Sequence, residues 1–440
     1  MNWLWRIDVV DGPVVWGLRI AAAVALAYLF LRPRGGRVWY LAAAGVTMAG
    51  GIIGLGIVWI VYGLLDLAGP LIHGVRPWAI LAFAGVALGL LSLFWRGGRW
   101  WRRVLSVIAI IVFVLTGFVG INRAYGLQTT IGAVFHINTD DPVAVLHPPV
   151  EGSAASAGDP KSPLYTKWKP PADMPAIGQH GPLPADQQVP NAVSGFPARP
   201  AEIYYPPAAL VKDPPALPFV LMMMGQPGDP DSKWIGAALD KLAATHNGLA
   251  PIVLVVDQLG DPSQDPLCID GKLGNVETYV MQDVVPWVHQ NLHVLKNRDA
   301  WTVAGYSAGG GCALYYGAKY PKVFGNIVSI SGEVYSGAES AAANLDSMFD
   351  GDQAAYDAIK PTTIYTHTKY PDTRAYFSAG SADPTYVQFM AEASSSAIAA
   401  GIHAETFVVP GGDHVIGGLT GGLDLTLSAL YPRLGLAPPS

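Results

Sequence analysis

Four apolar stretches within the first 121 residues constrain most strongly what this chain can fold into. They run over residues 14–31, 39–65, 78–95 and 104–121. Each is long enough to cross the hydrocarbon core of a bilayer, which takes roughly 17 to 25 residues of helix. Buried helices of a water-soluble protein are the alternative, but they would need a large surrounding core that this part of the chain lacks. The sequence therefore predicts four transmembrane spans.

Basic residues in the short loops predict the orientation of these spans, because Lys and Arg near span ends stay on the cytoplasmic side. In the middle loop Arg76 is balanced by Asp66, whereas the first and third loops are basic. Both termini, and everything after the fourth span, are therefore expected outside the cytoplasm. The basic loop residues are Arg32, Arg34, Arg37, Arg96, Arg99, Arg102 and Arg103.

The first span is expected to be retained, so that the protein crosses the plasma membrane several times. No small-residue cleavage site follows Leu31, as it would after a secretory signal peptide. Arg19 lies inside this span but near its outer end, where its aliphatic stem can reach the interface. We interpret the spans mainly as an anchor, because they contain few polar residues.

Composition divides the rest of the chain. Hydrophobic residues make up 51% of the sequence and charged residues 14%, which is too apolar for an ordinary soluble protein. We predict a transmembrane domain over 1–122, a linker rich in Pro, Ala, Gly and Ser over 123–200, and a folded domain over 201–440. The net charge of −6, with no basic block outside the membrane loops, argues against a nucleic-acid partner. The oligomeric state is not predicted.

The folded domain has the pattern of an α/β protein. Short apolar runs bounded by Gly, Pro and Asp are separated by segments of helix length. This alternation predicts a mostly parallel central sheet. The candidate strands are 202–205, 218–224, 252–256, 300–304, 326–330, 375–377 and 406–409.

Ser307 is the candidate nucleophile. It is the central residue of Gly305-Tyr306-Ser307-Ala308-Gly309, which fits the G-x-S-x-G turn that projects a serine above a sheet. A predicted strand enters this turn and residues 310–319 can form the helix that follows. A glycine-rich structural turn is the alternative interpretation.

A serine hydroxyl needs a base, and the base needs an acid that orients it. His414 is the predicted base, since it follows a late strand in a glycine-rich loop. Asp383 is the predicted acid, because families with this turn have the chain order Ser, acid, His. Glu333, after the 326–330 strand, is the alternative acid. Asp413 is adjacent to His414 and is a poor geometric partner for it.

Backbone N–H groups must stabilise the negative charge that develops on the ester oxygen. The two candidates are the amides of Ala308, directly after the nucleophile, and of Gln226, after the 218–224 strand. Such chemistry requires no organic cofactor and no metal. His289 and His293 are spaced for one helix face, but no nearby carboxylate pattern completes a metal site.

These motifs resemble the α/β-hydrolase esterases that include esterase D, feruloyl esterases and the antigen 85 mycolyltransferases of actinobacteria. The resemblance covers roughly residues 201–430, and the whole chain is most similar to actinobacterial proteins that join membrane spans to an esterase. It implies an α/β-hydrolase fold and a Ser307–Asp383–His414 triad. The mycolyltransferases have a tryptophan shortly after the catalytic histidine, which is absent here. The motifs that carry the resemblance are 224–228, 275–279, 283–287, 305–310 and 412–414.

The resemblance implies ester hydrolysis or acyl transfer in the cell envelope. The acyl group would pass from a lipid or other ester substrate to Ser307 and then to water or to a glycan acceptor. A non-catalytic envelope scaffold, or a lipid-binding protein with a hydrolase-like domain, is the alternative.

The chain has two cysteines, Cys268 and Cys312. Both lie in the domain expected outside the cytoplasm, where an oxidising environment permits a disulfide. Such a bond would connect the loop before Asn275 to the helix that follows the nucleophile. Two buried free thiols are the alternative.

Overall fold

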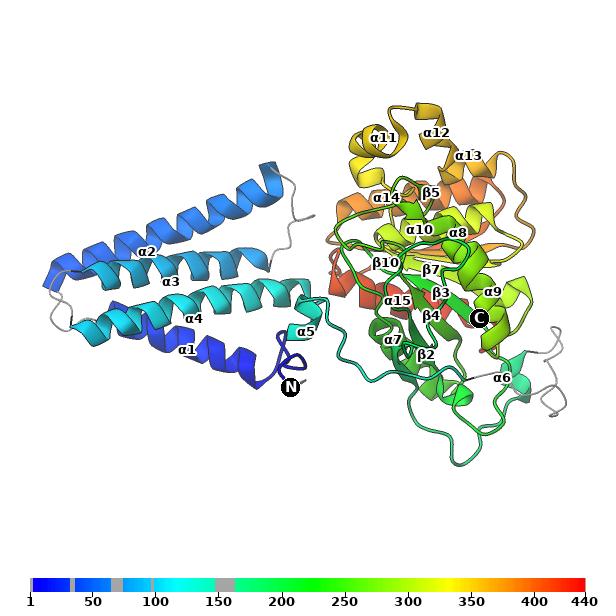
Figure 1. The fold of residues 1–440 in the computed structure, drawn as a ribbon, viewed down its shortest axis with the longest axis horizontal. Coiled ribbons are helices and arrows are strands. Elements are labelled where there is room, and N and C mark those ends of the chain that lie inside the picture. The colour runs from blue at the N-terminus through cyan, green and yellow to red at the C-terminus, as the bar shows by residue number, and fades with distance from the viewer. Residues whose placement is uncertain (1–2, 32–35, 65–73, 96–98, 147–162, 440) are drawn as a thin grey trace. The chain divides into compact units, whose positions relative to one another are not determined.

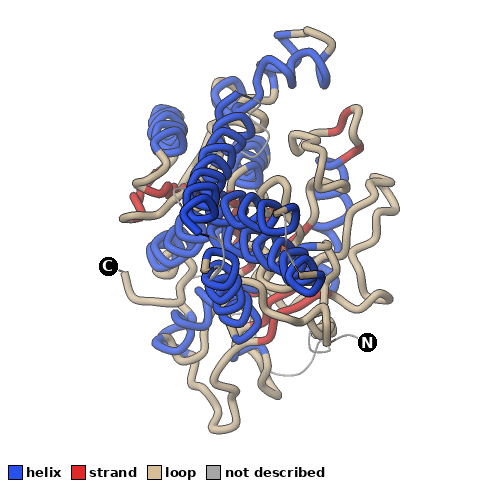
Figure 2. Tube along the Cα trace, turned by 90° about the vertical axis from the view of Figure 1, so that its left-hand side faces the viewer, coloured by secondary structure: helices blue, strands red, loops and turns tan. Residues whose placement is uncertain are grey.

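The computed structural model describes residues 3–31, 36–64, 74–95, 99–146 and 163–439. The chain divides into two compact units, Met1–Thr139 and Asp140–Ser440 (Figure 1). The described strands all belong to the second unit (Figure 2). The predicted orientation of the spans depends partly on Arg32, Arg34, Asp66 and Arg96, which lie outside the described residues.

The first unit contains four helices that are long and apolar enough to cross a membrane. Each corresponds to one predicted span, and their orientation in a bilayer stays a prediction. The helices are α1 (Pro13–Phe30), α2 (Gly36–Trp59), α3 (Val75–Phe94) and α4 (Trp100–Tyr125), and α2 continues as a π-helix, η1 (Ile60–Leu64).

Small residues allow these helices to approach one another closely, as in membrane helix pairs generally. A Cβ atom at Gly54 of α2 would lie 2.8 Å from the carbonyl oxygen of Ala79 in α3. A Cβ atom at Gly120 of α4 would lie 2.1 Å from the Trp78 ring. Side chains at these positions would therefore force the helices apart.

Part of the range predicted as a linker is folded. It contains the end of α4 and three short elements, α5 (Ile131–Val134), α6 (Leu164–Lys167) and the strand β1 (Gln179–Pro182). β1 pairs antiparallel with β2 (Glu202–Tyr205), and the Pro182 carbonyl accepts the N–H of Val143 at 2.9 Å. The high proline content of this segment argued against a strand, because proline occurs in sheets almost only on edge strands. β1 is such an edge strand.

The second unit is built on an eight-stranded sheet of order β1-β2-β4-β3-β7-β8-β9-β10. From β4 to β10 all neighbours are parallel, and β2 runs antiparallel to both β1 and β4. Every strand predicted from the sequence is present, as is the mostly parallel sheet. The further strands are β3 (Phe219–Met223), β4 (Ile252–Val256), β7 (Trp301–Tyr306), β8 (Asn326–Ile330), β9 (Arg374–Gly380) and β10 (His403–Val409).

Helices cover both faces of this sheet (Figure 1). α7 (Lys233–Thr245) packs against α15 (Ile416–Leu430), and α15 lies on strands β8 to β10. α10 (Ala308–Lys319) lies on β7 and β8, and α14 (Pro384–Ala399) lies on β9 and β10. Cover on both faces explains why β3, β4, β7 and β8 are buried along their whole length.

Short elements fill the connections that remain. The connection between β4 and β7 contains a two-stranded ribbon. It also contains a helical segment whose middle part is π-helical. One 3-10 helix and three short α-helices separate β8 from β9. The elements are η2 (Pro207–Ala209), β5 (Asp270–Gly271), β6 (Gly274–Asn275), α8 (Val276–Thr278), η3 (Tyr279–Val284), α9 (Val285–Asn291), η4 (Arg298–Ala300), η5 (Ala338–Ser340), α11 (Ala341–Phe349), α12 (Gln353–Ala358) and α13 (Pro361–Tyr365).

Candidate active site

Ser307 occupies a sharp turn between β7 and α10. Its backbone has φ 56° and ψ −123°, a conformation that costs a non-glycine residue roughly 1–3 kcal/mol. The turn is fixed by a hydrogen bond from the Ser307 N–H to the Ile330 carbonyl at 3.0 Å. Gly305 and Gly309 have to be glycines, since Cβ atoms there would lie 1.8 Å and 2.3 Å from backbone oxygens. The motif is therefore built as the G-x-S-x-G pattern predicts.

His414 lies beside the serine. Its Nε2 atom is 2.9 Å from Oγ of Ser307. The loop that carries it follows β10 and is held from two sides. Tyr306 donates its hydroxyl hydrogen to the His414 carbonyl, and Ala382 donates its N–H to the Gly412 carbonyl at 2.8 Å. The ring therefore sits on a fixed loop above the carboxyl end of the sheet.

Asp383 is the third of three side chains that contact one another in sequence, after Ser307 and His414. Its Oδ2 atom lies 2.8 Å from Nδ1 of His414, and its side chain is only 5% exposed. A carboxylate at Nδ1 places the imidazole proton there and leaves Nε2 free to accept the serine proton. The arrangement has the geometry needed to activate a serine nucleophile.

Glu333 is held elsewhere. Its carboxylate accepts the N–H groups of Gly337 at 2.8 Å and of Glu339 at 3.0 Å. Burial raises its pKa to about 8, so it favours the neutral form more than an ordinary carboxyl group does. The partner of His414 Nδ1 is Asp383, not this alternative acid.

The two predicted oxyanion donors are on segments that flank the serine. Ala308 is the first residue of α10, so its N–H lies at a helix N-terminus. Gln226 follows Gly225, where a Cβ atom would lie 3.0 Å from Cβ of Ser307. The loop after β3 therefore passes directly beside Ser307.

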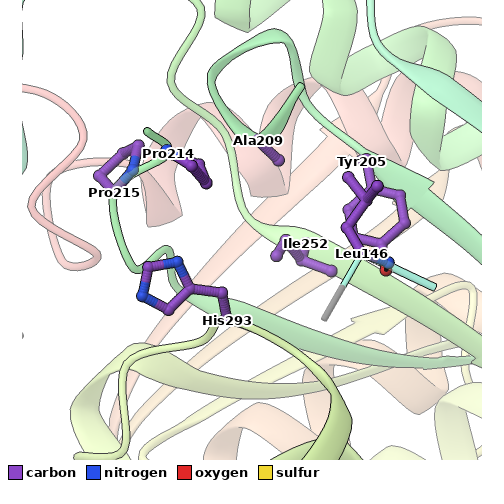
Figure 3. A pocket seen from close by; sticks show the side chains of 7 residues that line it. All are labelled: Leu146, Tyr205, Ala209, Pro214, Pro215, Ile252 and His293. Atoms are coloured by element: carbon purple, nitrogen blue, oxygen red, sulfur yellow. Dashed lines mark hydrogen bonds between the residues drawn. The ribbon is translucent and has the colours of Figure 1, made fainter. Parts of the chain in front are cut away.

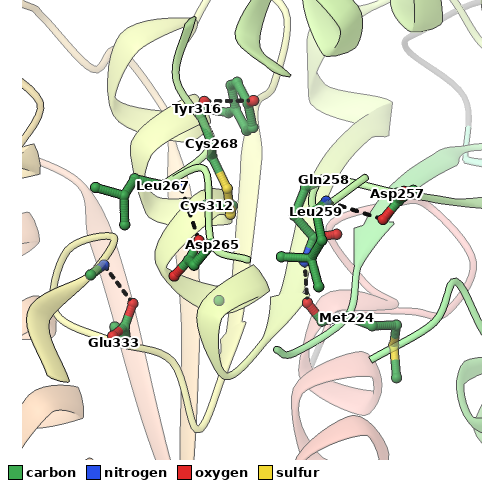
Figure 4. The surroundings of a disulfide bond; sticks show 12 residues. Met224, Asp257, Gln258, Leu259, Asp265, Leu267, Cys268, Cys312, Tyr316 and Glu333 are labelled. Atoms are coloured by element: carbon green, nitrogen blue, oxygen red, sulfur yellow. Dashed lines mark hydrogen bonds between the residues drawn. A yellow bond between two sulfur atoms is a disulfide. The ribbon is translucent and has the colours of Figure 1, made fainter. Parts of the chain in front are cut away.

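Two side chains that sequence reasoning missed hold this loop. Arg199 donates to the Gly228 carbonyl at 2.7 Å and forms ion pairs with Asp229 and with the buried Asp257. Gln258 donates its side-chain N–H to the Met224 carbonyl (Figure 4). A single arginine in a proline-rich stretch carries no motif that could have indicated this role.

Tyr386 is a further residue at the site that the sequence did not indicate. Its ring centroid lies 3.9 Å from that of His414, and the residue is 1% exposed. Its buried hydroxyl faces the side chains of Ser307 and Glu339, and burial raises the pKa of the hydroxyl far above its usual range. A protonated hydroxyl thus lies next to Ser307.

The predicted disulfide between Cys268 and Cys312 is present (Figure 4). Its Cα atoms are 5.6 Å apart, and Cys312 lies in the first half of α10. Tyr316, one turn further along α10, donates its hydroxyl hydrogen to the Cys268 carbonyl at 2.8 Å. The loop before β5 is thereby attached to the helix that begins at the nucleophile.

His289 and His293 take no part in this site. His289 stacks on Trp301 with ring centroids 4.3 Å apart. His293 lies beyond the end of α9 and lines a cavity of about 20 Å³, enough for one water molecule (Figure 3). In the part of the chain that the structure describes, no three His, Cys, Asp or Glu side chains are grouped to bind a metal.

Known proteins resemble this chain in both sequence and structure. Residues 200–415 match a family described as "Putative esterase". An uncharacterized protein of Corynebacterium glutamicum is 30% identical over 350 residues, which cover 77% of this chain and 78% of the relative. A ferulic acid esterase structure is 14% identical with a TM-score of 0.49, covering 60% of this chain and 100% of its own. An S-formylglutathione hydrolase from Agrobacterium tumefaciens is 17% identical with a TM-score of 0.44, covering 53% and 90%.

Proposed function

We propose a serine esterase or acyltransferase function for this chain, which belongs to the same family as the Corynebacterium glutamicum protein and contains an esterase domain. The observation that carries the proposal is the continuous contact of Ser307, His414 and Asp383, at 2.9 Å and 2.8 Å. Three residues from three separate loops meet in the order that nucleophilic catalysis requires.

In the first half-reaction, Nε2 of His414 accepts the proton of the Ser307 hydroxyl while Oγ attacks the ester carbonyl carbon. The tetrahedral intermediate collapses, the carbon–oxygen bond of the ester breaks, and His414 gives its proton to the departing alcohol. Asp383 stabilises the imidazolium that exists between these two events. In the second half-reaction, water or another hydroxyl group attacks the acyl-enzyme and the proton returns to Ser307.

The N–H groups of Ala308 and Gln226 are the proposed donors to the oxyanion of that intermediate. Loss of one such donor typically slows catalysis by about a hundredfold to a thousandfold. Arg199 acts here as a positioning residue. It holds the loop that carries Gln226 through Gly228 and Asp229 and so keeps that N–H in place before substrate binds.

The hydroxyl of Tyr386 is the proposed hydrogen-bond partner for the alcohol oxygen of the ester. It lies on the His414 side of Ser307, where the alcohol must receive its proton. Because the buried hydroxyl faces Ser307, an ester bound at Ser307 would place its alcohol oxygen near this hydrogen-bond donor.

The proposed location is outside the cytoplasm, and the proposed substrates are lipid or glycan esters of the cell envelope. Four helices long and apolar enough to cross a membrane precede the esterase domain. Attachment to a bilayer confines an enzyme to substrates at that surface and raises their local concentration. A glycan hydroxyl is the proposed acyl acceptor wherever transfer replaces hydrolysis.

Hydrolysis of p-nitrophenyl esters by the purified full-length protein tests this proposal. We expect release of p-nitrophenol with acyl chains of a defined length range, and loss of activity in Ser307→Ala. Ser395→Ala, an exposed serine of α14, is the matched control and should keep full activity. A folded wild type that hydrolyses no ester, and forms no acyl product with a sugar acceptor, would favour the scaffold alternative.

A further inference from the structure

The helical unit has a shallow, broadly open and cationic cavity on its surface near one end. Its volume is about 400 Å³, and all of its lining residues belong to Met1–Thr139. α1 and α3 begin at this end and α4 ends there, so that Arg19, Trp78 and Arg123 meet at a similar depth. The lining residues are Arg19, Gly74, Trp78, Arg123 and Ala124.

Arg19 is held in place without an acidic partner. Its guanidinium carbon lies 5.0 Å from the Trp16 ring centroid and 5.1 Å from that of Trp78. Throughout the described ranges it forms no ion pair. A charge within a membrane span is energetically costly, and cation–π contacts offset only part of that cost. An anion beside Arg19 would offset much of the remaining cost.

The opposite wall of the cavity carries a second guanidinium group. Arg123 is 3.3 Å from Asp11, and both side chains are substantially exposed. Among the described residues, Arg19 and Arg123 line the cavity, and Arg123 pairs with the Asp11 carboxylate. Two guanidinium groups with planar N–H donors suit the oxygen atoms of a phosphate.

An apolar surface continues from this charge along α1. Trp16, Ile20 and Val24 are one helical turn apart, and their exposed fractions are 56%, 62% and 63%. A membrane lipid has the matching chemistry, because its phosphate lies at the interface and its acyl chains lie beside such a stripe. A free phosphate ion would use only the charged part.

We propose that this cavity binds the phosphate headgroup of an anionic phospholipid, with the acyl chains along Trp16, Ile20 and Val24. The site is independent of Ser307 and of the esterase proposal. It would give the helical unit a specific lipid partner in addition to its role as an anchor. The residues that recognise the phosphate are Arg19 and Arg123, and Trp78 supports Arg19.

Native mass spectrometry of the full-length protein, released from detergent, tests the site. The protein is titrated with phosphatidylglycerol and, separately, with phosphatidylcholine of identical acyl chains. We expect the wild type to bind phosphatidylglycerol at least about fivefold more tightly, the effect of one arginine near a membrane surface. Arg19→Gln should lose this preference.

Arg37→Gln is the matched control, since Arg37 is an exposed arginine at the first turn of α2, at the other end of the bundle. It should keep the preference of the wild type. Arg123→Gln is a second variant, for use if Arg19→Gln fails to give monodisperse, helical protein, and should also lose the preference. An unchanged preference in a folded Arg19→Gln or Arg123→Gln protein would overturn the proposal.

Inorganic phosphate, titrated in place of lipid, separates the two sources of the anion. We expect it to displace phosphatidylglycerol only weakly, because it lacks acyl chains. Arg19-dependent binding of phosphate without any preference between the two lipids would also overturn the proposal, since the cavity would then be a site for soluble anions.

Discussion

The Nε2 atom of His414 lies 2.9 Å from Oγ of Ser307, although 107 residues separate the two along the chain. The contact exists because β7 and β10 run in the same direction, so the loops at their carboxyl ends meet at one edge of the sheet. Asp383, in the loop after β9, reaches the same edge and contacts the other ring nitrogen. The topology of the sheet thereby assembles the three groups.

Asp383→Asn should lower kcat for a p-nitrophenyl ester by about ten-thousandfold, because an amide favours the wrong imidazole tautomer. Glu333→Gln, which removes the charge of the other candidate acid, should leave kcat within about tenfold of the wild type. Steady-state kinetics of the two variants at one pH decide between the acids. The opposite ranking would show that Glu333 orients His414.

Tyr386→Phe removes only the hydroxyl and keeps the ring against His414. We expect kcat/KM for ester hydrolysis to fall by roughly tenfold to a hundredfold, the usual effect of one hydrogen bond to a reacting group. The melting temperature should change little, since the ring keeps its packing on His414. Unchanged kinetics would exclude contact between this hydroxyl and the substrate.

Removal of the disulfide should destabilise the second unit. Cys268 and Cys312 are 44 residues apart, and closing a loop of that size stabilises a fold by about 4 kcal/mol in the chain-entropy treatment. Thermal unfolding of the Cys268→Ser, Cys312→Ser protein should show a lower melting temperature. The same decrease should follow when the wild type is reduced, and an unchanged melting temperature in both cases would contradict the prediction.

Burial of Glu333 predicts a dependence of stability on pH. Its pKa is raised from 4.5 to about 8, so the folded protein keeps a proton that the unfolded chain releases. The stability that this group contributes is fully present below about pH 4.5 and is lost as the pH rises through about 8, by up to about 1.4 kcal/mol per pH unit. Asp265 and Glu339, the negative groups beside it, act in the same direction.

Melting temperatures of the full-length protein between pH 5 and 9 measure this effect. Glu333→Gln should flatten the decrease with pH. Glu392→Gln, at an exposed position on α14, is the control and should keep the wild-type slope. Equal slopes in the Glu333 variant and the wild type would show that the carboxyl group is already ionised at neutral pH.

Periodicity and local motifs in the sequence predicted the sheet and the nucleophile turn. The strand 252–256 was placed correctly because it is apolar throughout and lies between Pro251 and Asp257. Gly305 and Gly309 indicated the turn. Backbone atoms occupy the space that a side chain at either position would need. An apolar strand and a glycine turn are determined by residues adjacent in the sequence, so they can be predicted from one sequence.

Contacts between distant residues that no motif indicates could not be predicted. The edge strand β1 lies in a proline-rich segment and becomes a strand only by pairing with β2. Arg199 binds Asp257, which is 58 residues further along the chain. Tyr386, in the first turn of α14, packs against the ring of His414. Chain order favoured Asp383 over Glu333 as the acid. The fold determines which carboxylate contacts His414: Asp383 does, whereas Glu333 accepts the N–H of Gly337.

Labelling with a fluorophosphonate probe tests the central claim most directly, because the probe reacts covalently only with an activated serine. The full-length wild type should be labelled at one site, Ser395→Ala should be labelled equally, and Ser307→Ala should not be labelled. Heat-denatured wild type should also remain unlabelled, since Ser307 is activated only by the folded arrangement of His414 and Asp383. Labelling that persists in Ser307→Ala, or no labelling of folded wild type, would contradict the account.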